Sequence, residues 1–301
     1  MATALDDKSK IYCSPPFKFL IGDTAIYVHV DLVTQCSRPL ERMIHGSMVE
    51  AKQGFATLED VGLNTFLRFV QWLYHGYYDA ASPRNLPASE KSQIEDEVVE
   101  PGQPDLHPSL INLRNTTDDR PLVADSFIGD VQLYVYAGRG YQPYYKEDEE
   151  KARGQSLKES FIRRIYRVRN IKKDAPQPRQ NSNKREDYSE VFLGHARLYV
   201  FADKYDIQTL KEFTIEELHA TLAVYTLYQE RTGDIVRLLR YVYANTAETK
   251  SGVEDLRTLL TQYMEVEIDT LIKDEDLQGL MIEDGGPLLA DLMKVVRNKL
   301  A

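Results

Sequence analysis

Within the first eighty residues, the spacing of hydrophobic side chains changes from every second position to about every 3.6 positions. Residues 17–22 and 25–30 are short runs rich in β-branched and aromatic side chains, and the segment Gly22-Asp23-Thr24 between them is typical of a tight hairpin turn. From residue 32 to residue 48, apolar side chains recur every three or four positions. This part of the chain therefore predicts two paired strands followed by a helix.

A further strand and helix are predicted before residue 80. Residues 57–61 read as a third short strand with its turn, and residues 66–74 form an apolar helical face. Gly76 follows as a C-cap, because glycine readily takes the left-handed conformation in which many helices end. Far downstream, apolar periodicity predicts two more helices over residues 195–205 and 209–220.

This order of elements carries a resemblance to a known family. Residues 14–80 together with His195-Ala-Arg-Leu-Tyr-Val-Phe-Ala-Asp-Lys-Tyr-Asp-Ile-Gln-Thr-Leu210 resemble a BTB/POZ domain, most closely the BTB proteins of filamentous fungi. The chain departs from that family at Val30, where a basic residue is usual, and in having more than 100 residues between the two matching blocks. The positions that match the family's histidine after the second strand, its serine in the first helix, its Lys-Glu-Ser-type turn and its Leu-Tyr-x-Gly helix end are His29, Ser37, Val49-Glu50-Ala51 and Leu73-Tyr74-His75-Gly76.

The resemblance implies an α+β fold in which a small three-stranded sheet is flanked by a cluster of helices. Residues 14–80 and 190–220 would form this BTB/POZ domain in two blocks, after an N-terminal tail over residues 1–13. Residues 81–189 are rich in Pro, Asp, Glu, Ser and Gln, so we expect a long charged insertion that is mostly loop and partly disordered. Further helical periodicity over residues 221–301 predicts a helical C-terminal extension, with separate helices at 221–229, 234–245, 253–266 and 274–282 and a last one after Pro287.

The insertion carries opposite charges in its two halves. Residues 79–150 hold 15 acidic and 6 basic side chains, whereas residues 151–190 hold 12 basic and 5 acidic ones, and such blocks usually stay solvated. Residues 131–136 alternate as a short strand would. Residues 156–170 predict a basic amphipathic helix, which either packs on the core or contacts a partner, a membrane surface or nucleic acid.

Composition narrows the class of protein. The net charge of −10 argues against nucleic acid as the main partner, because a polyanion would be repelled. Cys13 and Cys36 are the only cysteines, so neither a disulfide framework nor a zinc site is indicated, and Cys36 in an apolar stripe reads as a buried, inert thiol. Without an apolar leader or a run of 18 apolar residues, we expect an intracellular protein of the cytoplasm or nucleus with no membrane association.

No local catalytic motif occurs in the sequence. It contains no GxSxG, GxxxxGK[ST], HExxH, CxxC or GxGxxG pattern. We therefore expect no catalytic residue, no cofactor and no metal. An enzyme of a kind that these motifs do not reveal stays as an alternative to the two non-catalytic functions described below. The six histidines are scattered without metal-ligand spacing, at His29, His45, His75, His107, His195 and His219.

The resemblance implies a non-catalytic protein-interaction module. BTB domains commonly self-associate through the first helix, which places a homodimer interface at Asp31, Leu32 and Gln35. Many recruit a cullin-type ubiquitin ligase through an apolar residue, any residue and then an acid after that helix, and Met48-Val49-Glu50 fits this pattern. In this reading the chain is a self-associating adaptor that brings substrates to a cullin.

The alternative reading is a nuclear regulatory protein. Lys172 and Lys173 are followed about ten residues later by Lys184 and Arg185, a spacing typical of a bipartite import signal, and the same segment could contact nucleic acid. No zinc finger, basic zipper or helix-turn-helix signature accompanies them. Salt-dependent retention on DNA separates this alternative from the interaction module.

Overall fold

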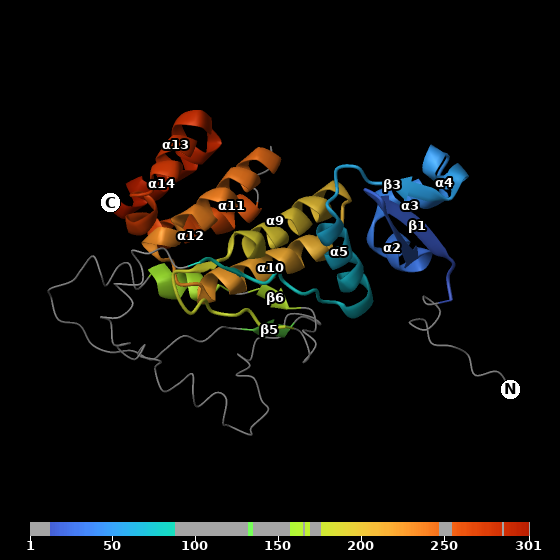
Figure 1. Ribbon diagram of the computed structural model, residues 1–301, viewed down its shortest axis with the longest axis horizontal. Helices are drawn as coiled ribbons and strands as arrows, with labels where there is room; N and C mark the ends of the chain where they lie inside the picture. Colours follow the sequence, from blue (N-terminus) through green and yellow to red (C-terminus); the bar gives the residue numbers. More distant parts are fainter. Residues whose placement is uncertain are drawn as a thin grey trace, which may run out of the picture.

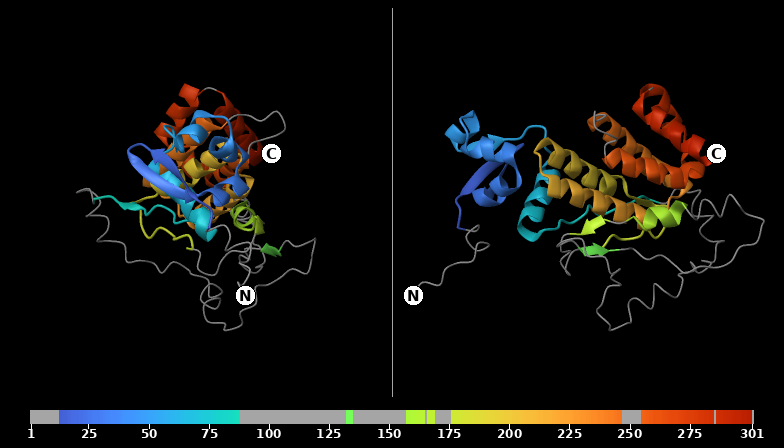
Figure 2. Two further views of the ribbon diagram at one scale, coloured as in Figure 1. Left: turned by 90° about the vertical axis from the view of Figure 1, so that its right-hand side faces the viewer. Right: turned by 180° about the vertical axis from the view of Figure 1, so that it is seen from behind.

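The computed structural model describes residues 13–87, 132–134, 157–164, 166–168, 176–246, 255–284 and 286–300. The described chain is a mixed α+β structure, in which a small three-stranded sheet lies at one end and a stack of helices at the other (Figure 1). The view from behind in Figure 2 shows the same separation of the N-terminal sheet from the C-terminal helices. The predicted combination of a small three-stranded sheet with many helices is therefore confirmed.

The sheet has the order β2-β1-β3, with β1 at Pro16–Ile21, β2 at Thr24–His29 and β3 at Phe55–Thr57. β1 pairs antiparallel with β2 and parallel with β3. Ile21 pairs with Thr24, so the hairpin has a two-residue turn, and Gly22 adopts the φ of +56° that such a turn requires. The third strand lies two residues earlier than predicted, because residues 55–57 are those in register with β1.

The helix predicted over residues 32–48 is broken into shorter ones, and that prediction was wrong. The helices are α2 at Val30–Cys36, α3 at Arg38–His45 and α4 at Val49–Gln53. Ser37 is extended and its hydroxyl accepts a hydrogen bond from the Leu40 backbone N–H, so it is the N-cap of a new helix. Pro39 lies in the first turn of α3, where its missing N–H costs nothing.

One core joins the sheet to the downstream block of the sequence. The inward residues of β1 are buried, and Phe19 contacts Phe66 of α5, Leu63–His75, with ring centroids 5.1 Å apart. Phe69 of the same helix contacts Phe201 of α9, Ser189–Lys204, at 4.8 Å. Because these rings interlock, the segments before residue 80 and after residue 188 stabilise each other.

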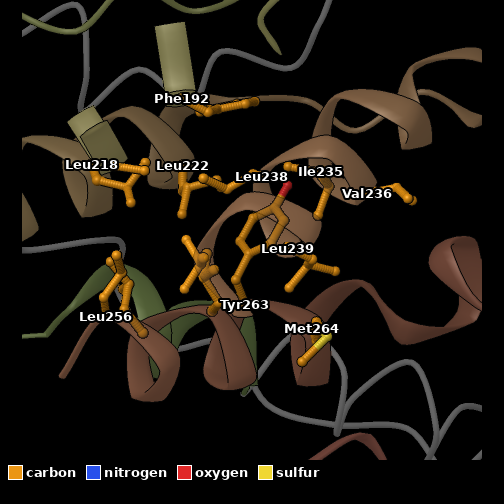
Figure 3. Close-up of a cluster of buried hydrophobic side chains, with 14 of the residues drawn as sticks. Phe192, Leu218, Leu222, Ile235, Val236, Leu238, Leu239, Leu256, Tyr263 and Met264 are labelled. Atoms are coloured by element: carbon orange, nitrogen blue, oxygen red, sulfur yellow. The ribbon is translucent and has the colours of Figure 1, made fainter. Parts of the chain in front are cut away.

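A second core lies among the later helices. α10, Gln208–Val224, runs beside α9, and α11, α12, α13 and α14 follow. Figure 3 shows part of this cluster, with Tyr263 surrounded by aliphatic side chains. No separate helix covers residues 221–229, because α10 continues to Val224 and only the short 3-10 turn Gln229–Arg231 precedes α11. The bounds of the last helices are Thr232–Asn245 for α11, Asp255–Leu271 for α12, Glu275–Asp284 for α13 and Pro287–Leu300 for α14.

The two ends of the predicted insertion are paired with each other. β4, Arg84–Asn85, pairs antiparallel with β7, Glu186–Asp187, and β5, Gln132–Tyr134, pairs with β6, Tyr166–Val168. β5 falls within the strand predicted over residues 131–136. The amphipathic helix predicted over residues 156–170 was wrong in its second half, because helix covers only residues 157–162 and β6 follows.

Candidate functional site

The exposed turn at α4 brings the three partner-binding candidates together. Met48 is the N-cap of α4 and is 48% exposed, and the adjacent Val49 is 68% exposed. Glu50 lies in the first turn, where the helix dipole favours a negative charge, and Gly54 ends the helix in the left-handed conformation. Met48 and Val49 thus form a small exposed apolar patch beside a carboxylate.

The outer face of the sheet continues from this turn. Gly54 is followed at once by β3, and Gln53 donates a 2.9 Å side-chain hydrogen bond to the Phe55 carbonyl. In the register of the sheet Lys18 stands between Phe55 and Tyr27, with its ammonium 4.5 Å from the Phe55 ring centroid. Tyr27 is 62% exposed. Sequence reasoning missed this aromatic face, although the alternation of buried Phe17, Phe19 and Ile21 signals that residues 18 and 20 point outward.

The dimer-interface candidates lie on α2. Gln35 is exposed, whereas Asp31 and Leu32 are partly buried. The Asp31 backbone N–H donates to the Ser14 hydroxyl at 3.2 Å, which fixes the chain before β1 to the start of α2. All three candidates remain accessible on one short helix.

The structure describes two of the four basic-contact candidates. Lys172 and Lys173 lie outside the described residues. Lys184 is partly buried and forms an ion pair with Glu230 at 3.2 Å, while Arg185 is exposed. An ion-paired lysine on a fixed turn offers less charge to a receptor or to phosphate than a free one.

The surroundings of Cys36 and His195 fix the protonation states of these two side chains. The Cys36 thiol donates to the Val33 carbonyl at 3.2 Å, and burial raises its pKa to about 12, so the reactive thiolate does not form near neutral pH. His195 is fully buried, with Nδ1 2.7 Å from the Tyr78 hydroxyl, and burial lowers its pKa to about 3. The imidazole is therefore neutral and serves as a hydrogen-bonding group between α9 and the segment after α5.

Comparison with known proteins assigns the chain to no family. No protein-family model matches the chain, and no curated protein matches it. Among the described residues, no helix combines the length and apolarity needed to cross a bilayer. Within the same residues, no three His, Cys, Asp or Glu side chains are grouped so that they could hold a metal ion.

Proposed function

We propose that the chain is a non-catalytic protein-interaction module of the BTB/POZ type. The element order β1-β2-α2-α3-α4-β3-α5, with α9 and α10 closing the core, supports this proposal. The observation that carries it is the exposure of Met48 and Val49 beside Glu50 on one turn.

The physical basis is desolvation of an apolar anchor next to a charge. Burying an exposed methionine or valine side chain in a partner's groove yields roughly 1.5–3 kcal/mol. A carboxylate at its edge accepts charge-assisted hydrogen bonds, which select the orientation of the partner. In this contact Met48 would supply binding energy, and Glu50 would fix the orientation of the partner.

The partner that this surface fits is a cullin-type ubiquitin ligase scaffold, with the chain as substrate adaptor. Self-association through Asp31, Leu32 and Gln35 of α2 would place two such surfaces in one assembly. A two-fold interface of this kind is the commonest form of homo-oligomer.

An affinity pull-down with purified wild-type chain tests the adaptor proposal. We expect a cullin among the captured proteins, and we expect the Met48→Ala/Glu50→Ala variant to lose it. Met293→Ala is the matched control, because Met293 is 52% exposed and belongs to α14, which lies at the opposite end of the molecule from α4 (Figure 1). A cullin absent from the wild-type capture, or captured equally by the double variant, would overturn the adaptor proposal.

A further inference from the structure

A cavity of about 230 Å³ lies where the two ends of the segment between the blocks meet the long helices. Its walls are residues 78–83, residues 176–179, and side chains of α9 and α10. This volume is below the roughly 300–1,000 Å³ of pockets for drug-sized ligands, so the cavity suits a small molecule or one side chain. The lining is rich in proline and tyrosine, with Pro83, Pro176, Pro178, Tyr78 and Tyr188.

Glu217 of α10 is the acidic side chain of that lining whose charge is unmatched. Among the described residues, its carboxylate makes neither a hydrogen bond nor an ion pair, although most of the side chain is buried. A largely desolvated carboxylate without a partner is costly, and here partial burial raises the pKa of Glu217 to about 7. A cation in the cavity would remove this cost.

The other charged groups around the cavity are already engaged. Arg179 is paired with Glu186, with N–O distances of 3.0 and 3.1 Å. The side chain of Arg68 donates to the Asp79 carbonyl, and the Asp79 carboxylate accepts a hydrogen bond from Gln71. None of these groups neutralises Glu217.

The tyrosine and histidine beside Glu217 also leave it unpaired. The hydroxyl of Thr221 donates to the Glu217 backbone carbonyl at 2.8 Å, so it can accept from Nε2 of His195, 3.5 Å away. Nδ1 of His195 then accepts from the Tyr78 hydroxyl. The Tyr78 hydroxyl therefore donates its hydrogen bond to His195 and is not available as a donor to Glu217. The neutral imidazole of His195 brings no positive charge. On α10 itself, the neighbouring Glu216 adds only repulsion.

We propose that this cavity binds an organic ammonium or guanidinium cation of side-chain size. The positive group pairs with Glu217, and its carbon chain packs against the parts of Tyr78, Tyr188 and the proline rings that line the cavity. Aromatic rings attract such cations, so Tyr78 adds to the affinity. The guanidinium of Arg179 already lies 6.0 Å from the Tyr188 ring centroid, so Tyr188 contributes apolar contact. The cation is either a free small amine or the side chain of a lysine or arginine in a peptide.

Occupation of the site would couple the two ends of the intervening segment. Residues 78–83 and 176–179 both line the cavity, and a cation contacting both holds them against α9 and α10. Binding also selects the ionised form of Glu217, so below neutral pH it releases a proton. With a pKa of about 7, we expect about tenfold weaker binding at pH 6 than at pH 8.

Calorimetric titration of the full chain tests the proposal with defined probes. The cationic probes are n-butylamine, agmatine and the peptide acetyl-Gly-Lys-Gly-amide, and butan-1-ol is the neutral counterpart of butylamine. We expect at least one cationic probe to bind and butan-1-ol not to bind. Tighter binding of a free amine assigns a small-molecule source, and tighter binding of the peptide assigns a protein source.

Two adjacent glutamates provide matched variants. Glu217→Gln keeps the shape of the side chain and removes its charge, and we expect it to weaken binding at least tenfold while the thermal unfolding temperature is kept or raised. Glu216→Gln makes the same change one position away, outside the lining, and should bind as the wild type does. Absence of binding by every cationic probe at millimolar concentration, equal binding of butan-1-ol, or unchanged binding to Glu217→Gln would overturn the proposal.

Discussion

The Ser37 hydroxyl donates a 2.6 Å hydrogen bond to the backbone carbonyl of Tyr205, which lies 168 positions later in the chain. The same oxygen accepts from the Leu40 N–H and caps α3. Ser37 is 1% exposed, so neither bond can be replaced by bulk water. One small side chain thus starts α3 and ties the junction between α2 and α3 to the turn between α9 and α10.

Ser37→Ala is expected to lower the free energy of unfolding by about 1–3 kcal/mol, because it removes the cap and leaves a buried carbonyl without a donor. Chemical denaturation monitored by circular dichroism measures the change. Ser47→Ala, at an exposed position before α4, is the control and should leave stability within about 0.5 kcal/mol of wild type. Equal stability of the two variants would show that the Ser37–Tyr205 bond contributes nothing.

Two buried tyrosines of the helical core should respond oppositely to loss of the hydroxyl. The Tyr263 hydroxyl has no hydrogen-bond partner among the described residues, whereas the Tyr243 hydroxyl donates to Asp291 at 2.8 Å. We expect Tyr263→Phe to raise the unfolding free energy by about 1 kcal/mol and Tyr243→Phe to lower it by a similar amount. Thermal unfolding of both variants checks this, and destabilisation by Tyr263→Phe would indicate that its hydroxyl is satisfied.

Glu217 makes stability depend on pH in a defined direction. Its folded pKa of about 7 lies above the ordinary value of 4.5, so its favourable contribution is complete below pH 4.5 and is lost as the pH rises through 7. Between pH 5 and pH 8 the protein that keeps Glu217 should therefore lose up to about 3 kcal/mol relative to Glu217→Gln. Both proteins carry Glu216→Gln in this comparison, because burial and then the charge of Glu217 raise the pKa of Glu216 to about 7, and this pKa would otherwise differ between them. The buried histidines titrate alike in both proteins, so they cancel in the difference. A difference that stays constant with pH contradicts the assigned burial.

Self-association through α2 should be sensitive to charge at its exposed position. Light scattering after size exclusion, at micromolar concentration, should give twice the chain mass for the wild type. In the proposed two-fold interface, Gln35→Arg would place like charges close together, and this should shift the protein toward monomer. Gln229→Arg, on the turn before α11, is the control and should remain dimeric. A strictly monomeric wild type rules out the dimer.

Local patterns in the sequence were sufficient for the elements of the first block. The alternation at β1 and β2 and the apolar face of α5 were read correctly, because side-chain period follows directly from strand and helix geometry. The break at Ser37 was missed although its signal is local, since Ser37 followed by Pro39 is a helix start.

Other features depend on contacts between distant segments. Residues 166–168 continue a helical pattern in sequence, and become a strand by pairing with residues 132–134. Nothing in the sequence pattern distinguishes Glu217 from the other carboxylates of the predicted helix over residues 209–220. Glu217 is mostly shielded from solvent because residues 78–83 and 176–179 lie against α10, which no periodicity reveals. Exposure of Met48 and Val49 likewise depends on how α4 turns away from the core.

The most direct test of the proposed function is a calorimetric titration of the purified chain with the purified N-terminal domain of a cullin. We predict saturable binding that Met48→Ala/Glu50→Ala weakens at least tenfold, or by about 1.4 kcal/mol, and that Met293→Ala leaves unchanged. Absence of binding by the wild-type chain, or equal affinity of the double variant, would contradict the role assigned to the α4 surface.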